Sequence, residues 1–212
     1  GAARVLVVSD RGVAAAGHTQ LGLDSLESAG MAVDLYDGVE ENPTTIHVGE
    51  GLERAEAFRP DLLVGLGGGS AMDCAKGINF VLTNGGQIED YQGHSKASKP
   101  MLPSIGIPTT AGTGSEAQRF TLIAQDQGEH QKMACGDCKV RFRTVLLDPD
   151  LLSTAPAAVV AAAAVDAVAH AVESFVTTRA NPVSRLFAGE ALRLLHGSFE
   201  SWVGNHQSND TG

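Results

Sequence analysis

The segment Leu62-Leu63-Val64-Gly65-Leu66-Gly67-Gly68-Gly69-Ser70-Ala71-Met72-Asp73 decides how the rest of the sequence is interpreted. An apolar run of strand length ends at Leu66, small residues follow, and a helical pattern begins near Ala71. Glycines let backbone N–H groups approach an anion closely, and a helix N-terminus adds about half a positive charge. The segment therefore predicts a strand, a pyrophosphate-binding turn and a helix, although it lacks the G-x-G-x-x-G pattern. A tight turn whose glycines only need positive φ is the alternative.

Strand-like and helix-like patterns alternate on both sides of this segment. Short apolar runs predict strands at 4–9, 32–36, 62–66 and 104–107, and helical spacing predicts helices at 21–29, 46–58 and 71–82. Strands separated by helices imply a parallel sheet with helices on both faces. The expected fold class is α/β: a Rossmann-like parallel-sheet nucleotide-binding domain followed by the first helices of an all-α domain.

The pattern changes after Asp148-Pro149. No strand-like run follows, and we expect helices at 156–178, with Ser153 or Thr154 as N-cap, and at 182–195. A boundary near residue 150 gives a dinucleotide-binding α/β domain at 1–150 and a helical domain at 151–212. The polar tail at 204–212 has no packing pattern and is expected to fray.

Composition argues against two classes of partner. The chain has 25 Asp and Glu against 15 Lys and Arg, and nucleic-acid binding needs a basic face. The longest apolar run, at 155–165, stops before Asp166 and is shorter than the ~20 residues that a bilayer span needs. We therefore expect neither a nucleic acid nor a membrane as partner.

The cysteines indicate a reducing compartment. Cys74, Cys135 and Cys138 cannot all pair within one chain, and no secretory signal opens the sequence, so a cytoplasmic protein is expected. The spacing of Cys135 and Cys138 fits a redox pair or half a zinc site, but no second cysteine pair follows to complete zinc coordination. Two incidental loop thiols are the favoured interpretation.

A second loop of small residues follows the predicted strand at 104–107. It reads Pro108-Thr109-Thr110-Ala111-Gly112-Thr113-Gly114-Ser115-Glu116 and supplies several hydroxyl groups. Two such loops at the carboxyl ends of neighbouring parallel strands face one crevice, which favours a phosphate-bearing ligand over a plain helix cap. Asp10 ends the first strand, where an acidic residue can bind a ribose diol and repel a 2′-phosphate. A solvated loop carboxylate is the alternative for Asp10.

Asp166 and His170 lie four residues apart, on one face of the predicted helix at 156–178. A buried carboxylate in an Ala/Val-rich helix costs several kcal/mol unless it is paired, and a metal ion bound by both side chains supplies a reason. An Asp–His hydrogen bond or an exposed polar stripe is the alternative, since this spacing is common on helices. The spacing alone leaves these interpretations open.

Four motifs occur in a fixed order: Gly67-Gly68-Gly69-Ser70 with Asp73, the loop at 108–116, Leu147-Asp148-Pro149, and Asp166-Ala167-Val168-Ala169-His170-Ala171-Val172-Glu173. Together they resemble the iron-containing (group III) alcohol dehydrogenase family, over residues 5 to about 195. The resemblance implies an N-terminal dinucleotide-binding domain and a C-terminal helical domain. It also implies an NAD-dependent enzyme that transfers hydride between a small alcohol and an aldehyde or ketone, assisted by a catalytic metal.

The resemblance assigns roles to individual residues. Asp166 and His170 correspond to two of four metal ligands, for iron or zinc. The acid at position 10 implies that NAD(H) is preferred, with NADP possible. The residues assigned to cofactor binding are Asp10, Asn42, Gly68, Gly69, Ser70, Asp73, Thr109, Thr110, Thr113, Lys132 and Leu151.

Two histidine ligands of the family have no counterpart, because neither His196 nor His206 matches them. The sequence therefore looks like a truncated member with no complete catalytic set, a weak or absent metal and impaired activity. The alternatives are a non-catalytic dinucleotide-binding fragment and a self-assembling module. Glycerol dehydrogenase-like and dehydroquinate synthase-like relatives use other patterns around the metal helix. The Ala/Val-rich helix should leave apolar surface exposed, so we expect a homo-oligomer formed through residues 156–195.

Overall fold

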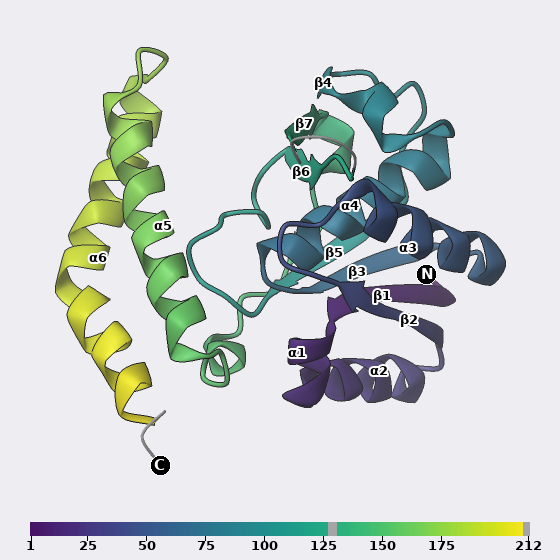
Figure 1. Cartoon of the computed structure of the whole chain (residues 1–212), viewed down its shortest axis with the longest axis horizontal. Helices are drawn as coiled ribbons and strands as arrows, with labels where there is room; N and C mark the ends of the chain where they lie inside the picture. Colours follow the sequence, from purple (N-terminus) through teal and green to yellow (C-terminus); the bar gives the residue numbers. More distant parts are fainter. Residues whose placement is uncertain (127–130, 210–212) are drawn as a thin grey trace. The chain divides into compact units, whose positions relative to one another are not determined.

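The computed structural model describes residues 1–126 and 131–209 (Figure 1). The chain divides into two compact units. The first comprises Gly1–Thr109 and Ser115–Asp148, and the second comprises Thr110–Gly114 and Pro149–Gly212. The loop of small residues at 108–116 therefore begins and ends in the first unit, while its middle belongs to the second.

A parallel sheet forms the centre of the first unit, as the sequence predicts, and its fifth strand, β8, adds to the four predicted ones. Its spatial order is β2-β1-β3-β5-β8. The valine-rich strand β1 and the strand β3 are buried along nearly their whole length, as expected for a parallel sheet covered on both faces. The strands are β1 (Arg4–Asp10), β2 (Ala32–Val39), β3 (Leu62–Gly67), β5 (Ser104–Pro108) and β8 (Thr144–Val145).

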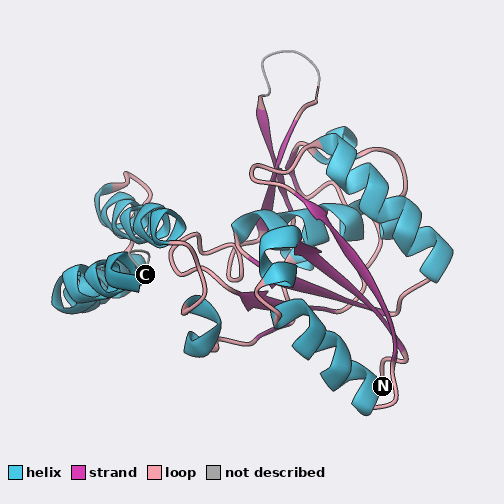
Figure 2. Cartoon of the chain, turned by 60° about the horizontal axis from the view of Figure 1, so that its bottom comes forward, coloured by secondary structure: helices cyan, strands magenta, loops and turns pink. Residues whose placement is uncertain are grey.

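Helices cover both faces of this sheet (Figures 1 and 2). On one face lie α1 (Arg11–Ala15), which the sequence patterns did not predict, and α2 (His18–Ser28). On the other face lie α3 (Thr45–Phe58) and α4 (Gly69–Asn84). Every residue of α4 from Ala71 to Val81 is buried, so this helix forms the centre of the core. The glycine turn thus leads directly into the most deeply buried helix of the first unit.

A second, three-stranded sheet was missed by the sequence analysis. It has the order β4-β7-β6 and is made of β4 (Gly93–His94), β7 (Lys132–Gly136) and β6 (Phe120–Ala124). Short 3-10 helices precede and follow it, at η1 (Ile88–Tyr91) and η2 (Cys138–Val140). Ile123 and Met133 join the main hydrophobic core, so this sheet is part of the same packed body.

The second unit contains η3 (Pro149–Leu152) and two long antiparallel helices, α5 (Ala157–Val176) and α6 (Pro182–Asn209) (Figure 1). Two expectations are wrong here. The N-cap of α5 is Pro156, because Ser153 is used one turn earlier, where its hydroxyl donates to the Asp150 carbonyl at 2.7 Å. The second helix does not end at residue 195 but continues through 204–209, where no proline interrupts it; residues 210–212 lie outside the described part.

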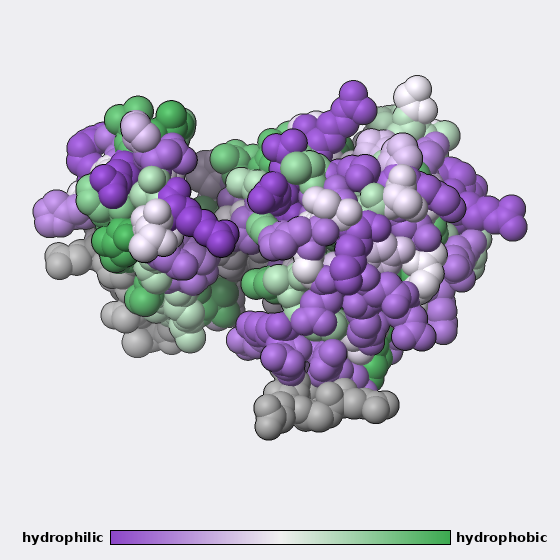
Figure 3. All heavy atoms as spheres, turned by 90° about the horizontal axis from the view of Figure 1, so that it is seen from above, coloured by the Kyte–Doolittle hydropathy of each residue, from purple (hydrophilic) through white to green (hydrophobic). Residues whose placement is uncertain are grey.

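Apolar side chains lie at the surface of this helical pair, as Figure 3 shows on the left of the view. Leu186 and Phe187 are each 70% exposed, and Val165, Val176 and Val183 are each at least 60% exposed. Within the described residues, α5 is also the one helix long and apolar enough to cross a membrane by length and composition. The helix continues past Asp166 to Val176, as the pattern at 156–178 predicts. A single helix of this kind is weak evidence for a membrane span.

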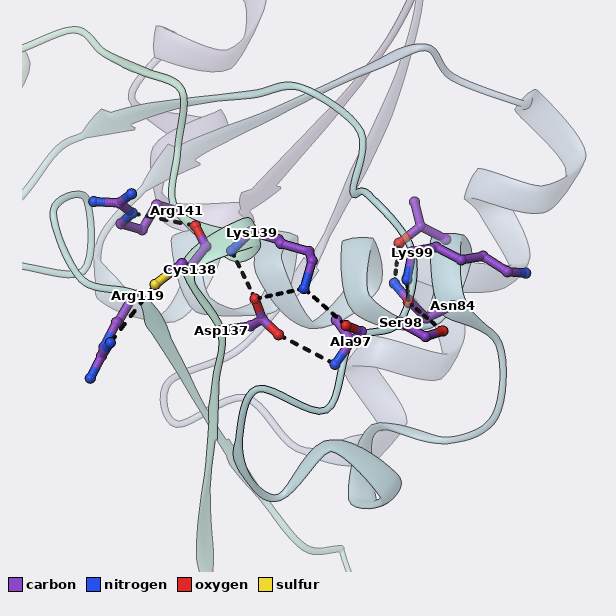
Figure 4. A network of polar contacts seen from close by, with 10 residues as sticks. Asn84, Ala97, Ser98, Lys99, Arg119, Asp137, Cys138, Lys139 and Arg141 are labelled. Carbon is purple, nitrogen blue, oxygen red and sulfur yellow. Dashed lines mark hydrogen bonds and ion pairs between the residues drawn. The ribbon is translucent and has the colours of Figure 1, made fainter.

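All three cysteines are free thiols, and their interpretation as incidental thiols stays a prediction. Cys135 is buried and Cys138 is exposed, and burial raises the pKa of the Cys135 thiol to about 11. Asp137, which lies between these two cysteines in sequence, has a structural role. The buried Asp137 carboxylate accepts hydrogen bonds from the backbone N–H groups of Ala97 (3.3 Å) and Lys139 (3.0 Å), which ties two loops together (Figure 4). The cytoplasmic location stays a prediction.

Candidate functional site

The first group of predicted residues lies where the chain order of the parallel sheet reverses. β2 flanks β1 on one side and β3 flanks it on the other, so β1 and β3 form the switch point at which open α/β sheets bind ligands. Asp10 ends β1 and Gly67 ends β3. A Cβ atom on Gly67 would lie 3.1 Å from Asp10 Oδ2, so the carboxylate lies against the glycine turn.

One carboxylate oxygen of Asp10 has a structural role and the other faces the turn. Oδ1 accepts a hydrogen bond of 2.9 Å from the backbone N–H of Val13 and caps α1. Oδ2 is the oxygen nearest to Gly67. Because the cap holds the side chain in place, the second oxygen is presented at the carboxyl edge of the sheet.

The glycine turn presents an uncapped helix end. Gly68 is the N-cap residue of α4, and no side-chain hydrogen bond caps this helix within the described part of the chain. The first N–H groups of the 16-residue helix are therefore available to an anion. Ser70 Oγ accepts a hydrogen bond of 3.3 Å from the backbone N–H of Asn42. This contact brings Asn42, from the segment after β2, to the glycine turn.

Two further predicted residues are brought toward the same edge. The N–H of Thr109 donates to the Gly67 carbonyl at 2.9 Å, which joins the ends of β3 and β5. Lys132 pairs with Ala124 across the β6–β7 hairpin, and the N–H of Ala124 donates to the carbonyl of Pro43 at 2.8 Å. Lys132 thus starts β7 beside the segment that contains Asn42, which is 90 positions away in sequence.

Asp73 is placed differently from the other predicted cofactor residues. Its side chain is buried, and its Oδ2 accepts a hydrogen bond of 3.0 Å from the N–H of Leu122 in β6. Its Oδ1 lies 3.5 Å from the ammonium of Lys76. Burial raises the pKa of Asp73, while the neighbouring Lys76 opposes this shift. These contacts connect α4 to β6, and a role of Asp73 toward a cofactor stays a prediction.

The remaining predicted residues belong to the second unit. Thr110 and Thr113 lie in the segment Thr110–Gly114 of the second unit, and Leu151 lies in η3. Thr110 Oγ1 is buried and has no hydrogen-bond partner within the described residues. An orphaned buried hydroxyl is the kind of group that a bound ligand satisfies.

Asp166 and His170 are close enough to bind one ion. His170 Nε2 lies 3.7 Å from Asp166 Oδ1, and His170 Nδ1 lies 3.2 Å from the carbonyl of Gly112. A carbonyl partner at Nδ1 orients the ring and leaves Nε2 as the ligating atom. Ligand atoms at about 2.0–2.2 Å from a zinc ion are themselves about 3–4 Å apart, so the pair fits two positions of a metal site.

Two observations limit this metal interpretation. Both side chains are 44% exposed, because α5 lies largely at the surface. The expectation that the Asp166 carboxylate is buried is therefore wrong. No group of three or more His, Cys, Asp or Glu side chains within residues 1–126 and 131–209 could hold a metal ion. The pair therefore offers two ligands.

A parallel sheet with a glycine turn at its switch point defines an α/β protein of the Rossmann-like class. A model of the iron-containing alcohol dehydrogenase family matches residues 1–149. The chain belongs to this family.

Individual relatives agree with this assignment. The chain is 42% identical over 200 residues to alcohol dehydrogenase 4 of Schizosaccharomyces pombe, covering 94% of this chain and 47% of that protein. It is 35% identical over 205 residues to NAD-dependent methanol dehydrogenase of Bacillus methanolicus, covering 97% and 54%. The solved structure of alcohol dehydrogenase from Oenococcus oeni matches with a TM-score of 0.93 and 31% identity, covering 98% and 54%. The chain spans about half the length of the curated relatives it matches.

Sequence reasoning missed two residues that shape these sites. Lys76 is fully buried and contacts the carbonyls of Ser115 and Phe120. Gly112 packs against the backbone of α5. A lysine in the middle of an apolar helix, three residues after Asp73, is a signal that could have singled out Lys76. Gly112 carries no such signal, because its neighbour Ala163 lies 51 positions away.

Proposed function

We propose that this chain binds NAD(H) and serves metal-assisted hydride transfer between a small alcohol and an aldehyde or ketone. The observation that carries the proposal is the meeting of Asp10, the glycine turn and Asn42 at the switch point of the sheet. Family membership supports the reaction class. NADP is the second cofactor that this site could accept.

The chain's own residues would bind and orient the reactants. The uncapped N–H groups at the start of α4 receive the pyrophosphate, and Ser70 contributes a hydroxyl group. Asp10 Oδ2 accepts a hydrogen bond from a ribose hydroxyl. Asp166 and His170 supply one oxygen and one nitrogen ligand for iron or zinc. When bound, the dinucleotide supplies the hydride chemistry and the metal acts as a Lewis acid.

The test combines binding and turnover on the purified chain. NADH is titrated by fluorescence, and NAD reduction is followed with a panel of primary alcohols in the presence of Fe²⁺ or Zn²⁺. Binding with turnover supports the proposal. Binding without turnover favours the alternative, a non-catalytic dinucleotide-binding fragment. Absence of binding at millimolar NADH contradicts both.

The cofactor preference should depend on the charge of Asp10. Replacing Asp10→Asn keeps the cap on α1 but removes the negative charge that repels a 2′-phosphate. Charges about 4 Å apart interact by about 1–4 kcal/mol between water and a protein surface, so affinity for NADPH relative to NADH should rise about fivefold or more. The ratio of the two dissociation constants is the measurement.

A matched control removes the same charge elsewhere. Asp34 lies within β2 and pairs with Arg54 at 2.6 Å, away from the carboxyl edge of the sheet. Asp34→Asn should leave the NADPH to NADH ratio unchanged. An unchanged ratio in Asp10→Asn as well would show that Asp10 is not the discriminating residue.

We also propose that the exposed apolar surface of α5 and α6 is covered by a second copy of the chain. Leu186 and Phe187 are the most exposed large apolar residues on this pair. Light scattering at tens of micromolar should give a dimer or a larger species, and Leu186→Glu with Phe187→Ser should shift it toward monomer. His196→Glu adds a charge at another exposed position of α6 and should not. A monomeric parent chain would contradict this proposal.

A further inference from the structure

Lys76 is a lysine buried in the core of the first unit. Its side chain is 1% exposed, and it projects from α4 one turn after Asp73. Lysine is almost never fully buried unless its charge is paired. Burial lowers the pKa of Lys76 and raises the pKa of Asp73, while the proximity of the two groups opposes both shifts. Burying this ammonium costs free energy unless hydrogen bonds and charge pairing compensate for it.

The ammonium group uses its donors on two backbone carbonyls. Nζ donates to the Ser115 carbonyl at 2.6 Å and to the Phe120 carbonyl at 2.7 Å. Asp73 Oδ1 lies 3.5 Å away, and the ring of Phe142 lies beneath the charge, 5.4 Å from Nζ to the ring centre. Charge-assisted hydrogen bonds of this length are stronger than neutral ones, so Lys76 fixes the two carbonyls in place.

Both carbonyls follow Thr110–Gly114, the segment of the second unit that we call the hydroxyl loop. Thr109 is the last residue before Thr110–Gly114, and its N–H is bonded to Gly67 at 2.9 Å. Ser115 is the first residue after it, and its carbonyl is held by Lys76. The two residues that flank the hydroxyl loop are thus both attached to the continuous segment that runs from the glycine turn into α4.

We infer that Lys76 is a positioning residue for dinucleotide binding, because it fixes Ser115, the residue that follows the hydroxyl loop, to the helix that begins at the glycine turn. This inference rests on the proposed function. Without the ammonium, Thr109 stays bonded to Gly67, but Ser115 is released from α4. Ser115 then loses its fixed placement on α4, whose first N–H groups form the glycine turn, and this weakens binding of a dinucleotide at this edge of the first unit.

Asn79 offers a matched control on the same helix. It is also buried, and it also holds a loop by two hydrogen bonds, from its Nδ2 to the Leu102 carbonyl (2.9 Å) and from the Leu102 N–H to its Oδ1 (3.0 Å). Leu102 precedes the start of β5, at the edge of the sheet opposite to the glycine turn. A substitution at Asn79 therefore removes a comparable buried polar clamp without touching the candidate site.

The experiment compares Lys76→Met with Asn79→Leu in NADH and NADPH titrations. The titrations are made at a temperature below the unfolding midpoints of both variants. Both variants should lower the midpoint. Lys76→Met should raise the dissociation constants of NADH and NADPH by the same factor, about tenfold or more, because Asp10 is untouched. Asn79→Leu should change them less than twofold. A purely structural brace would lower the midpoint in Lys76→Met and leave the dissociation constants of the folded protein unchanged, which would overturn the inference.

A second pair of variants covers the case in which Lys76→Met does not fold, because it leaves Asp73 buried and unpaired. Asp73→Asn removes that charge, and adding Lys76→Met to it isolates the loss of the two carbonyl contacts. The double variant should bind NADH about tenfold more weakly than Asp73→Asn alone, and equal binding overturns the inference. If the parent chain binds NADH and the Lys76 variants bind equally well, only this inference fails. If the parent chain binds no dinucleotide, the proposed function fails with it.

Discussion

Replacing Gly67→Ala should raise the dissociation constant of NADH by about 100-fold, which corresponds to about 2.8 kcal/mol. Gly67 has φ of 153°, a region that side chains rarely adopt, and an added Cβ would lie 2.7 Å from the Cβ of Ala71 and 3.1 Å from Asp10 Oδ2. The turn must move to relieve these contacts. The displaced atoms are the backbone N–H groups at the start of α4 and the carboxylate of Asp10, which are the proposed ligand contacts. Fluorescence titration measures the effect.

The C-terminal end of the same helix provides the control. Gly85 caps α4 with φ of 80°, and a Cβ there would meet nothing within 4 Å. Gly85→Ala carries a similar backbone penalty of about 1–2 kcal/mol but leaves the turn at Gly67 undisturbed. It should lower the unfolding midpoint and keep the NADH affinity. Unimpaired NADH binding in Gly67→Ala would show that the glycine turn does not hold the dinucleotide.

The central sheet could be predicted because its strands and helices are coded locally. Uninterrupted apolar runs such as Val5–Val8 can only be buried strands when helical segments of adequate length separate them. The glycine turn is equally local, since a strand, three glycines and a helix follow one another directly. The sheet of β4, β6 and β7 was missed because its strands have only two to five residues and because β4 pairs with β7 from a distant part of the sequence. The sequence near Phe120 does not indicate which strand β6 pairs with.

In the candidate site, too, local features could be predicted from the sequence, whereas contacts between distant segments could not. The sequence indicates that Asp10 ends a strand, but only the structure shows that its Oδ2 faces Gly67. The contact between Asn42 and Ser70 depends on a backbone N–H group, which no residue pattern specifies. Asp166 shows the opposite failure: the Ala/Val-rich sequence of α5 indicates a buried helix, yet this carboxylate is 44% exposed. Hydrophobic composition predicts which surfaces need cover, not whether the described chain covers them.

Gly112→Ala should strongly lower the free energy of unfolding of the second unit. Gly112 has φ of 142°, and an added Cβ would lie 1.9 Å from the carbonyl oxygen of Ala163 in α5. Backbone atoms cannot give way as a flexible side chain would, so the loop Thr110–Gly114 must separate from α5. The expected loss is about 3 kcal/mol or more, or a drop of about 6–12 °C in the unfolding midpoint. The same displacement removes the Gly112 carbonyl from His170 Nδ1, so Zn²⁺ affinity should fall with it.

Gly189→Ala is the matched control in the second unit, because Gly189 lies inside α6 and an added Cβ would meet only Phe175, at 4.0 Å. This change should raise the unfolding midpoint slightly, since alanine is favoured over glycine within helices by about 1 kcal/mol. Calorimetry and Zn²⁺ titration of the two variants separate a general effect of added methyl groups from the loss of one close backbone contact. Equal midpoints for Gly112→Ala and the parent chain would mean that the loop does not pack on α5. A lowered midpoint with unchanged Zn²⁺ affinity would instead mean that the Gly112 carbonyl does not orient His170, and the metal role of that histidine would lose its structural support.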